Sequence, residues 1–252
     1  MLEFLKPPIL AFQDFFVLGG RAIRNIFRKP HYFDDIALQM DSIGVGSLPI
    51  VMLTGFFSGA ILAMQMSRAL NQYGAASTVG QIVTLSLVRE MGPVLTALLV
   101  AGRNASGIAS ELGSMKVTEQ IDAMRALGTD PVQKLVTPRL IAMCIVLPLL
   151  VVIADFIGMF GGYLISCPVL QLTTATQYWS SSWRAIEYND IAQGLLKPFA
   201  FAIVISLVGC FYGMRTTGGT QGVGLATTRA VVVASIWVFV LTLLIGKVFV
   251  SM

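Results

Sequence analysis

Residues 47–70 read SLPIVMLTGFFSGAILAMQMSRAL, and this stretch carries no charged side chain before Arg68. A run of about 20 apolar residues is enough for a helix to cross the hydrocarbon core of a bilayer. The stretch therefore predicts a membrane-spanning helix. Gly55 and Gly59 are four residues apart on it, and a GxxxG pair of this kind lets a second helix approach closely, although two glycines can also occur at this spacing by chance.

Four further stretches of the same character follow, at residues 79–115, 140–165, 191–214 and 226–250. Of the 252 residues, 56% are hydrophobic and only 12% are charged, whereas a soluble domain is about 25% charged. The mean hydropathy is +0.79. This composition excludes a soluble enzyme, a nucleic-acid-binding domain and a disordered chain. It predicts an all-α polytopic membrane protein with five transmembrane helices.

The segment before the first span has a different pattern. Residues 9–29, between Pro7-Pro8 and Pro30, place apolar side chains on one side of a helix and arginines on the other. Such a helix is typical of one lying in the headgroup plane of a membrane, although a core-facing soluble helix is an alternative. Residues 31–46 are expected to be interfacial too. We therefore expect an interfacial region at residues 1–46 and a transmembrane domain at residues 47–252. The apolar face holds Phe12, Phe15, Phe16, Gly19, Ile23, Ile26 and Phe27, and the basic face Arg21, Arg24 and Arg28.

The distribution of basic residues predicts the orientation. If the N-terminus is cytoplasmic, twelve of the 17 Lys and Arg residues fall in the cytoplasmic segments. Because cytoplasmic segments carry an excess of Lys and Arg, this favours a cytoplasmic N-terminus, a cytoplasmic 116–139 connection and an outer C-terminus.

The 116–139 connection is the most polar long stretch between spans. Thr118 is expected to cap a helix over residues 119–127, with Gly128 ending it and Pro131 beyond. Its size and polarity fit a coupling helix that docks into a groove on a nucleotide-binding subunit, and equally an ordinary surface helix. We expect exposed side chains at Glu119, Asp122 and Arg125, and side chains available for burial at Ile121, Met124 and Leu127.

Arg89 and Glu90 lie well inside the second predicted span, just before Pro93. Charges at that depth are costly, so they are expected to pair within the bundle or to face a cavity. Both interpretations stand, and the proline favours the cavity because broken helices are tolerated where they line one. After Pro93, the residues Ala101, Ala105, Ala109 and Gly113 recur every four positions and predict tight helix packing.

Motifs for catalysis are absent from the sequence. No GxxxxGK[ST] sequence is present, so an ATPase would have to be a separate chain. HExxH, GxSxG and a paired-carboxylate motif are also missing. Cys144, Cys167 and Cys210 form no CxxC pattern, and His31 is the only histidine, so neither a metal site nor a cofactor is expected. Two other functions are alternatives: a lipid-modifying membrane enzyme using Arg89, Glu90 and Asp155, and a proton-coupled secondary transporter using Glu90.

The stretch from Leu87 to Ala142 resembles the signature of the MlaE (YrbE) permease family. It reads LVREMGPVLTALLVAGRNASGIASELGSMKVTEQIDAMRALGTDPVQKLVTPRLIA. The flanks GxxxGxxxxMQ at residues 55–65 and GVGLATTRAVV at residues 222–232 are similar as well. Two departures are the Arg103–Ser106 stretch, which is often smaller and contains glycine, and Leu225, where many relatives have arginine.

The resemblance implies an all-α permease with an N-terminal interfacial helix and five core spans, in the inner membrane. It implies a homodimer that binds two copies of an ABC ATPase, often a small STAS-domain protein, and a hexamer of an MCE-domain protein on the outer side. The substrate would be glycerophospholipid moved between the inner and outer membranes, which contributes to outer-membrane lipid asymmetry. ATP and Mg²⁺ would be bound by the ATPase and not by this chain.

The resemblance also implies roles for individual residues. Arg89, Glu90, Tyr73 and Leu70 fall where the family lines its lipid cavity. The ATPase-facing loop would hold the residues Glu119, Asp122, Arg125, Leu127, Gly128, Asp130 and Pro131.

Overall fold

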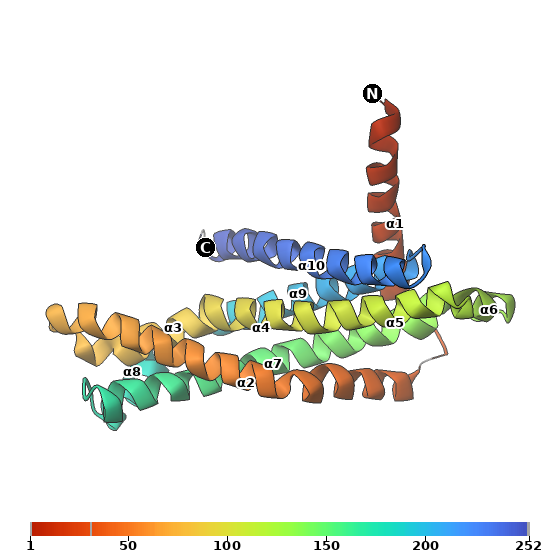
Figure 1. The fold of residues 1–252 in the computed structure, drawn as a ribbon. Helices are drawn as coiled ribbons and strands as arrows, with labels where there is room; N and C mark the ends of the chain where they lie inside the picture. Colours follow the sequence, from red (N-terminus) through yellow and green to blue (C-terminus); the bar gives the residue numbers. More distant parts are fainter. Residues whose placement is uncertain (1, 31, 251–252) are drawn as a thin grey trace. The chain divides into compact units, whose positions relative to one another are not determined.

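The computed structural model describes residues 2–30 and 32–250, so His31 lies outside the described residues. Every regular element within these ranges is helical, which confirms the all-α class (Figure 1). The α-helices are α1 (Leu2–Ile26), α2 (Phe33–Gln72), α3 (Val79–Ser86), α4 (Gly92–Val100), α5 (Ser106–Val117), α6 (Gln120–Ala126), α7 (Thr137–Leu164), α8 (Ala175–Ala185), α9 (Tyr188–Met214) and α10 (Gly219–Val250).

Several of these helices continue one another through short irregular turns. A 3₁₀ turn, η1 (Ala76–Thr78), precedes α3, and the π-helical turns are η2 (Leu87–Met91), η3 (Ala101–Ala105), η4 (Val132–Val136) and η5 (Ile165–Val169). Five of the resulting helical segments are long and apolar enough to cross a membrane, which confirms the predicted number. They are Phe33–Gln72, Ala76–Val117, Val132–Val169, Tyr188–Met214 and Gly219–Phe249.

Two helix starts differ from the prediction. Helix α1 starts at Leu2, so Pro7-Pro8 lie in its second turn and do not precede it as expected. The expected separate segment at residues 31–46 is the first part of α2, which runs unbroken through Pro49. Gly44 does not end the helix, because it packs closely against Val146: a Cβ there would lie 3.1 Å from Val146 Cγ1.

Three connections are also more helical than expected. The aromatic stretch after the third span contains α8, which Thr174 caps by accepting a hydrogen bond from the Gln177 amide at 3.3 Å. The glycine-rich stretch after α9 is short, because α10 already begins at Gly219. The expected 116–139 connection is reduced to residues 118–131, since α5 continues to Val117 and η4 begins at Val132.

The chain divides into two compact units. Unit 1 comprises Met1–Ile43, Val100–Ile145 and Ala202–Trp237, and unit 2 comprises Gly44–Leu99, Val146–Phe201 and Val238–Met252.

Unit 2 depends on a glycine contact between α2 and α7. A Cβ at Gly55 would lie 2.6 Å from the carbonyl oxygen of Ala154, and one at Gly59 would collide with the carbonyl oxygen of Gly158. The two backbones therefore touch directly, which confirms the close approach predicted from the GxxxG pair.

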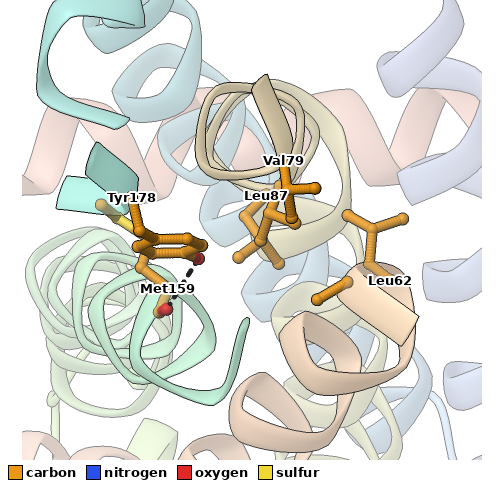
Figure 2. Packing of buried hydrophobic residues seen from close by; sticks show 7 residues of the cluster. Leu62, Val79, Leu87, Met159 and Tyr178 are labelled. Atoms are coloured by element: carbon orange, nitrogen blue, oxygen red, sulfur yellow. Dashed lines mark hydrogen bonds between the residues drawn. The ribbon is translucent and has the colours of Figure 1, made fainter. Parts of the chain in front are cut away.

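A cluster of buried apolar residues lies beside this contact (Figure 2). Leu62 from α2, Val79 from α3 and Met159 from α7 meet there with Leu87 and Tyr178. Tyr178 is completely buried, and its hydroxyl donates to the carbonyl oxygen of Met159 at 3.0 Å. Burial raises the pKa of this phenol, so the hydroxyl remains a donor. The cluster thereby attaches α8 to α3 and α7.

Unit 1 uses small residues in the same way. A Cβ at Gly209 would lie 3.1 Å from the carbonyl oxygen of Ala105, and one at Gly213 would lie 3.1 Å from that of Ala109. The small-residue ridge on the second span therefore packs against α9, as predicted. Helix α1 joins this unit through Asn25, whose amide donates to Asp130 at 3.3 Å.

Replacing Gly59 with leucine should prevent α2 and α7 from packing, because the obstacle is a backbone carbonyl group. Overpacking of a core costs about 1–3 kcal/mol even where side chains can move. We expect a large fall in the midpoint of thermal unfolding, measured by fluorescence-detected size-exclusion chromatography. Gly107→Ala is the control, since a Cβ there meets nothing within 4 Å. Equal unfolding midpoints for the two variants would contradict the proposed contact.

Candidate functional site

The π-helical turn η2 carries the two charged residues that the sequence places inside the second span. Pro93 has no N–H, so it cannot donate to the carbonyl group of Arg89 one helical turn earlier. A carbonyl group freed inside a membrane has no water to bind and needs another donor. The Arg89 carbonyl group, next to the charged side chains of Arg89 and Glu90, therefore needs a hydrogen-bond donor from elsewhere in the chain.

Helix α9 supplies this hydrogen-bond donor. Asp190, Gln193 and Lys197 are spaced by three and four residues, so they share one face of that helix. Lys197 is completely buried, and its ammonium group donates to the Arg89 carbonyl oxygen at 2.7 Å and to Glu90 Oε1 at 2.6 Å.

Arg89 binds the same face of α9 through its guanidinium group. Its Nε donates to Oδ1 of Asp190 at 2.5 Å, and the other oxygen of Asp190 accepts the Glu187 amide at 3.0 Å. The Gln193 amide donates to Glu90 at 3.3 Å. We call Arg89, Glu90, Asp190, Gln193 and Lys197 the polar network. The two adjacent charges thus do not pair with each other, and each has its own partner on α9.

The polar network is buried on one side and open on the other. The side chains of Asp190 and Lys197 are 4% and 0% exposed, whereas those of Arg89 and Glu90 are 45% and 49% exposed. Lys197 lies about 14 Å along α9 from its start, at 1.5 Å per residue, and thus at the depth of an apolar span. The four charges sum to zero. The open side therefore offers a guanidinium group and a carboxylate to a zwitterionic or hydrogen-bonding ligand.

The other two residues expected at this site lie elsewhere in unit 2. Leu70 packs against the buried cluster shown in Figure 2. Tyr73 is 83% exposed in the turn after α2, where Gly74 has a positive φ. No hydrogen bond or ion pair joins either residue to Arg89 or Glu90 among the described contacts, so only the charged pair forms a network.

Sequence reasoning missed the α9 side of the network. Asp190, Gln193 and Lys197 lie near the start of the fourth span, where polar residues are ordinary membrane-boundary residues. Their spacing on one helix face, beside a proline-freed carbonyl group on another span, is the signal that would have identified them.

Asp155 lies next to an apolar cavity of about 390 Å³ in unit 2. Asp155 is 8% exposed, and its Oδ1 has no hydrogen-bond partner among the residues that the structure describes. A Cβ at Gly92 would collide with it, so glycine allows the carboxyl group to approach η2. Phe156, Trp183 and Leu195 line the same cavity.

Among the described residues, no group of three or more His, Cys, Asp or Glu side chains could hold a metal ion.

The connection between α5 and α7 in unit 1 holds the predicted short helix, α6. Contrary to expectation, Thr118 does not cap it: its hydroxyl donates to the Ser114 carbonyl oxygen at 2.9 Å, because Glu119 takes a left-handed conformation with φ +62°. Gly128, with φ +80°, ends the helix as predicted, and its amide donates to the Arg125 carbonyl oxygen at 3.0 Å.

Side chains on α6 follow the expected pattern in part. Ile121 is buried, whereas Leu127 is 83% exposed. Asp122 accepts hydrogen bonds from Lys116 at 2.6 Å and from Arg125 at 3.2 Å. The bond from Lys116 holds the pKa of Asp122 below its usual value, so the carboxylate stays ionised near neutral pH.

The end of this connection is held by Asp130 and Pro131. Asp130 accepts the Val132 amide at 3.0 Å and the Asn25 amide at 3.3 Å, so it joins α1 to the start of η4. Pro131 follows it as the first residue of the next helical segment, where a proline is well tolerated. Pro131 is buried, whereas Asp130 is exposed, as are Glu119, Arg125, Leu127 and Gly128.

Replacing Lys197 with methionine should destabilise the chain by about 1–3 kcal/mol, because Glu90 and the Arg89 carbonyl group lose their donor. The measurement is the thermal unfolding midpoint in detergent. Adding Glu90→Gln to the Lys197→Met variant should cost less than the sum of the two single changes, since the residues are coupled. Additive effects would show that the ion pair contributes no stability.

Comparisons with known proteins show the family to which the chain belongs. A family model described as Permease MlaE matches residues 36–248, which include the polar network and all of α6. A probable ABC transporter permease protein of Rickettsia bellii is 43% identical over 235 residues, 93% of this chain and 90% of the relative. The intermembrane phospholipid transport system permease protein MlaE of Haemophilus influenzae is 36% identical over 241 residues, 91% of this chain and 92% of the relative. The chloroplastic protein trigalactosyldiacylglycerol 1 of Arabidopsis thaliana is 34% identical over 233 residues, 92% of this chain and 66% of the relative. On this match over most of its length, the chain belongs to the MlaE permease family.

Proposed function

We propose that this chain is the membrane permease subunit of an ABC transporter that moves glycerophospholipids between the inner and outer membranes. Relatives named as ABC transporter permeases, and the Haemophilus relative named for phospholipid transport, support the class of transporter. The observation that carries the proposal is the polar network, a charge-balanced site inside apolar spans with one open side. Transport of this kind contributes to outer-membrane lipid asymmetry.

In this proposal the open side of the network receives the lipid headgroup. Only Nε of the Arg89 guanidinium group is bound to Asp190, so the remaining N–H donors are available to a phosphate group. Glu90 is half-exposed and suits the ammonium or hydroxyl groups of the headgroup. Leu70 and Tyr73 would line the mouth of the lipid path. The chain holds and orients lipid without making or breaking covalent bonds.

The proposed assembly is a homodimer with two copies of an ABC ATPase, an MCE-domain hexamer on the outer side and, in some complexes, a STAS-domain protein. The ATPase would bind ATP and Mg²⁺, since the sequence has no Walker A motif. The excess of Lys and Arg favours a cytoplasmic N-terminus in the inner membrane.

The ATPase is proposed to dock on the connection between α5 and α7. Exposure of Leu127, an apolar residue in a polar connection, supports this role, because a groove on a partner would cover it. Glu119, Asp122 and Arg125 would form the polar rim of that contact. The remaining loop residues, Asp130 and Pro131, would hold the connection in place.

Glu90→Gln should lower lipid transport by about tenfold while the chain still folds, because the amide keeps a hydrogen-bond partner for Lys197 but removes the charge. The measurement is transfer of fluorescent phospholipid in proteoliposomes that contain the complete complex. Asp41→Asn makes the same charge change at an exposed position and should leave transport unchanged. Normal transport by Glu90→Gln would overturn the role of the network.

Leu127→Asp should weaken binding of the ATPase roughly tenfold to a hundredfold, since full burial of a leucine contributes about 1.5–3 kcal/mol. The measurement is ATPase retained on the tagged chain in mild detergent. Thr118→Asp puts the same charge on the same connection and is the matched control. Equal retention by the two variants would contradict docking on Leu127.

A further inference from the structure

Unit 1 contains two adjoining cavities that the polar network does not involve. One measures about 310 Å³ and is lined by Arg215, Thr217 and Arg229 among others, and the second measures about 170 Å³ and is lined by Phe12, Val233 and Trp237. Ala11, Phe211 and Tyr212 line both cavities, so the two form one continuous groove between α1, α9 and α10.

The polar end of the groove carries positive charge. Arg215 donates to Asp14 at 2.8 Å and lies 5.1 Å from the centre of the Phe211 ring. Its side chain is still 48% exposed, so several N–H donors remain open. Arg229 is exposed, and among the described residues no other charged side chain lines either cavity. Arg215, Arg229 and Asp14 together carry one net positive charge, which matches the single negative charge of a phosphodiester.

The apolar end continues along one face of α10. Arg229, Val233 and Trp237 are each four residues apart, so they follow one another on that face. Phe12 and Phe15 from α1 complete this part of the groove.

The position of the two arginines relates the groove to the membrane surface. Arg215 comes directly after the uncharged run that ends α9, and Arg229 comes directly before the uncharged run at residues 230–246. Both arginines therefore lie where an apolar span meets the headgroup layer, on the same side of the membrane. A phosphate group at the arginines would have its acyl chain directed along Val233 and Trp237, toward the hydrocarbon core.

We propose that this groove binds one anionic phospholipid, with the phosphate between Arg215 and Arg229 and one acyl chain beside Trp237. The site is separate from the proposed transport site, because it shares no residue with the polar network. A lipid held there would bind α1 to α9 and α10, so it would stabilise unit 1 without being transported.

The test uses fluorescence quenching of Trp237 in the full-length chain. The chain has three tryptophans, so Trp179→Phe and Trp183→Phe leave Trp237 as the only one. The protein is placed in nanodiscs of phosphatidylcholine that contain a minor fraction of either brominated phosphatidylglycerol or brominated phosphatidylcholine. Two basic contacts near a membrane surface predict stronger quenching by phosphatidylglycerol, corresponding to enrichment of about fivefold or more.

Arg215→Gln with Arg229→Gln should remove this preference. Arg21→Gln with Arg24→Gln removes the same charge from exposed positions on α1 and should keep it. If the double change at Arg215 and Arg229 prevents folding, Arg229→Gln alone decides the matter, because Arg229 is an exposed residue.

Three results would overturn the proposal. Equal quenching by the two lipids would show that the groove has no preference for an anionic lipid. A preference that survives the double change, or an undiminished preference after Arg229→Gln where the double variant does not fold, would show that the arginines do not bind the lipid. Loss of quenching on addition of inorganic phosphate would show that the site takes free phosphate instead of a lipid.

Unchanged transport by the Arg229→Gln variant would distinguish this site from the one at Glu90.

Discussion

The buried ammonium group of Lys197 is the contact on which the centre of unit 2 depends. Pro93 frees a carbonyl group inside a membrane span, and Glu90 places a carboxylate beside it. One side chain from α9 satisfies both, at 2.7 Å and 2.6 Å. Without it, a charge and a carbonyl oxygen would remain in an apolar environment, which is costly. The ion pair between Arg89 and Asp190 then orients η2 against the same helix face. The polar network therefore holds η2 against α9. Its exposed side, formed by Arg89 and Glu90, is the side proposed to bind a ligand.

Close packing between helix backbones makes the polar network possible. Gly55 and Gly59 let α2 lie directly on α7, and Gly92 leaves room for the carboxyl group of Asp155 beside η2. Membrane helices gain little from burying apolar surface against one another, because lipid is equally apolar. Contacts between small residues and a few satisfied polar groups therefore have to supply the specificity. Unit 1 follows the same rule, with Gly209 and Gly213 of α9 packed on the alanine ridge of the second span.

The features of this fold that could be predicted are those set by the composition of long stretches of sequence. The five spans and the GxxxG contact follow from apolar length and residue size, which depend little on tertiary context. Helix α8 and the early start of α10 could not be predicted, because Tyr178 and the glycines after Arg215 resemble loop residues until their packing is known. The cap was expected at Thr118 from the usual start signal of a helix. A left-handed conformation at Glu119 is rare for a non-glycine residue and could not be predicted. For the site, Arg89 and Glu90 were found from their depth in the second span. Lys197 was missed because it lies near the start of the fourth span, where a polar residue is ordinary.

Isolation of the tagged chain from its native membrane in mild detergent tests the permease proposal most directly. Bound proteins and bound lipids are then identified by mass spectrometry. We expect an ABC ATPase, an MCE-domain protein and a phospholipid in the same preparation. A chain that carries phospholipid but neither protein, and that moves lipid along an ion gradient in proteoliposomes, would contradict it. In that case Glu90 and Lys197 would have to be explained as part of a different kind of transporter.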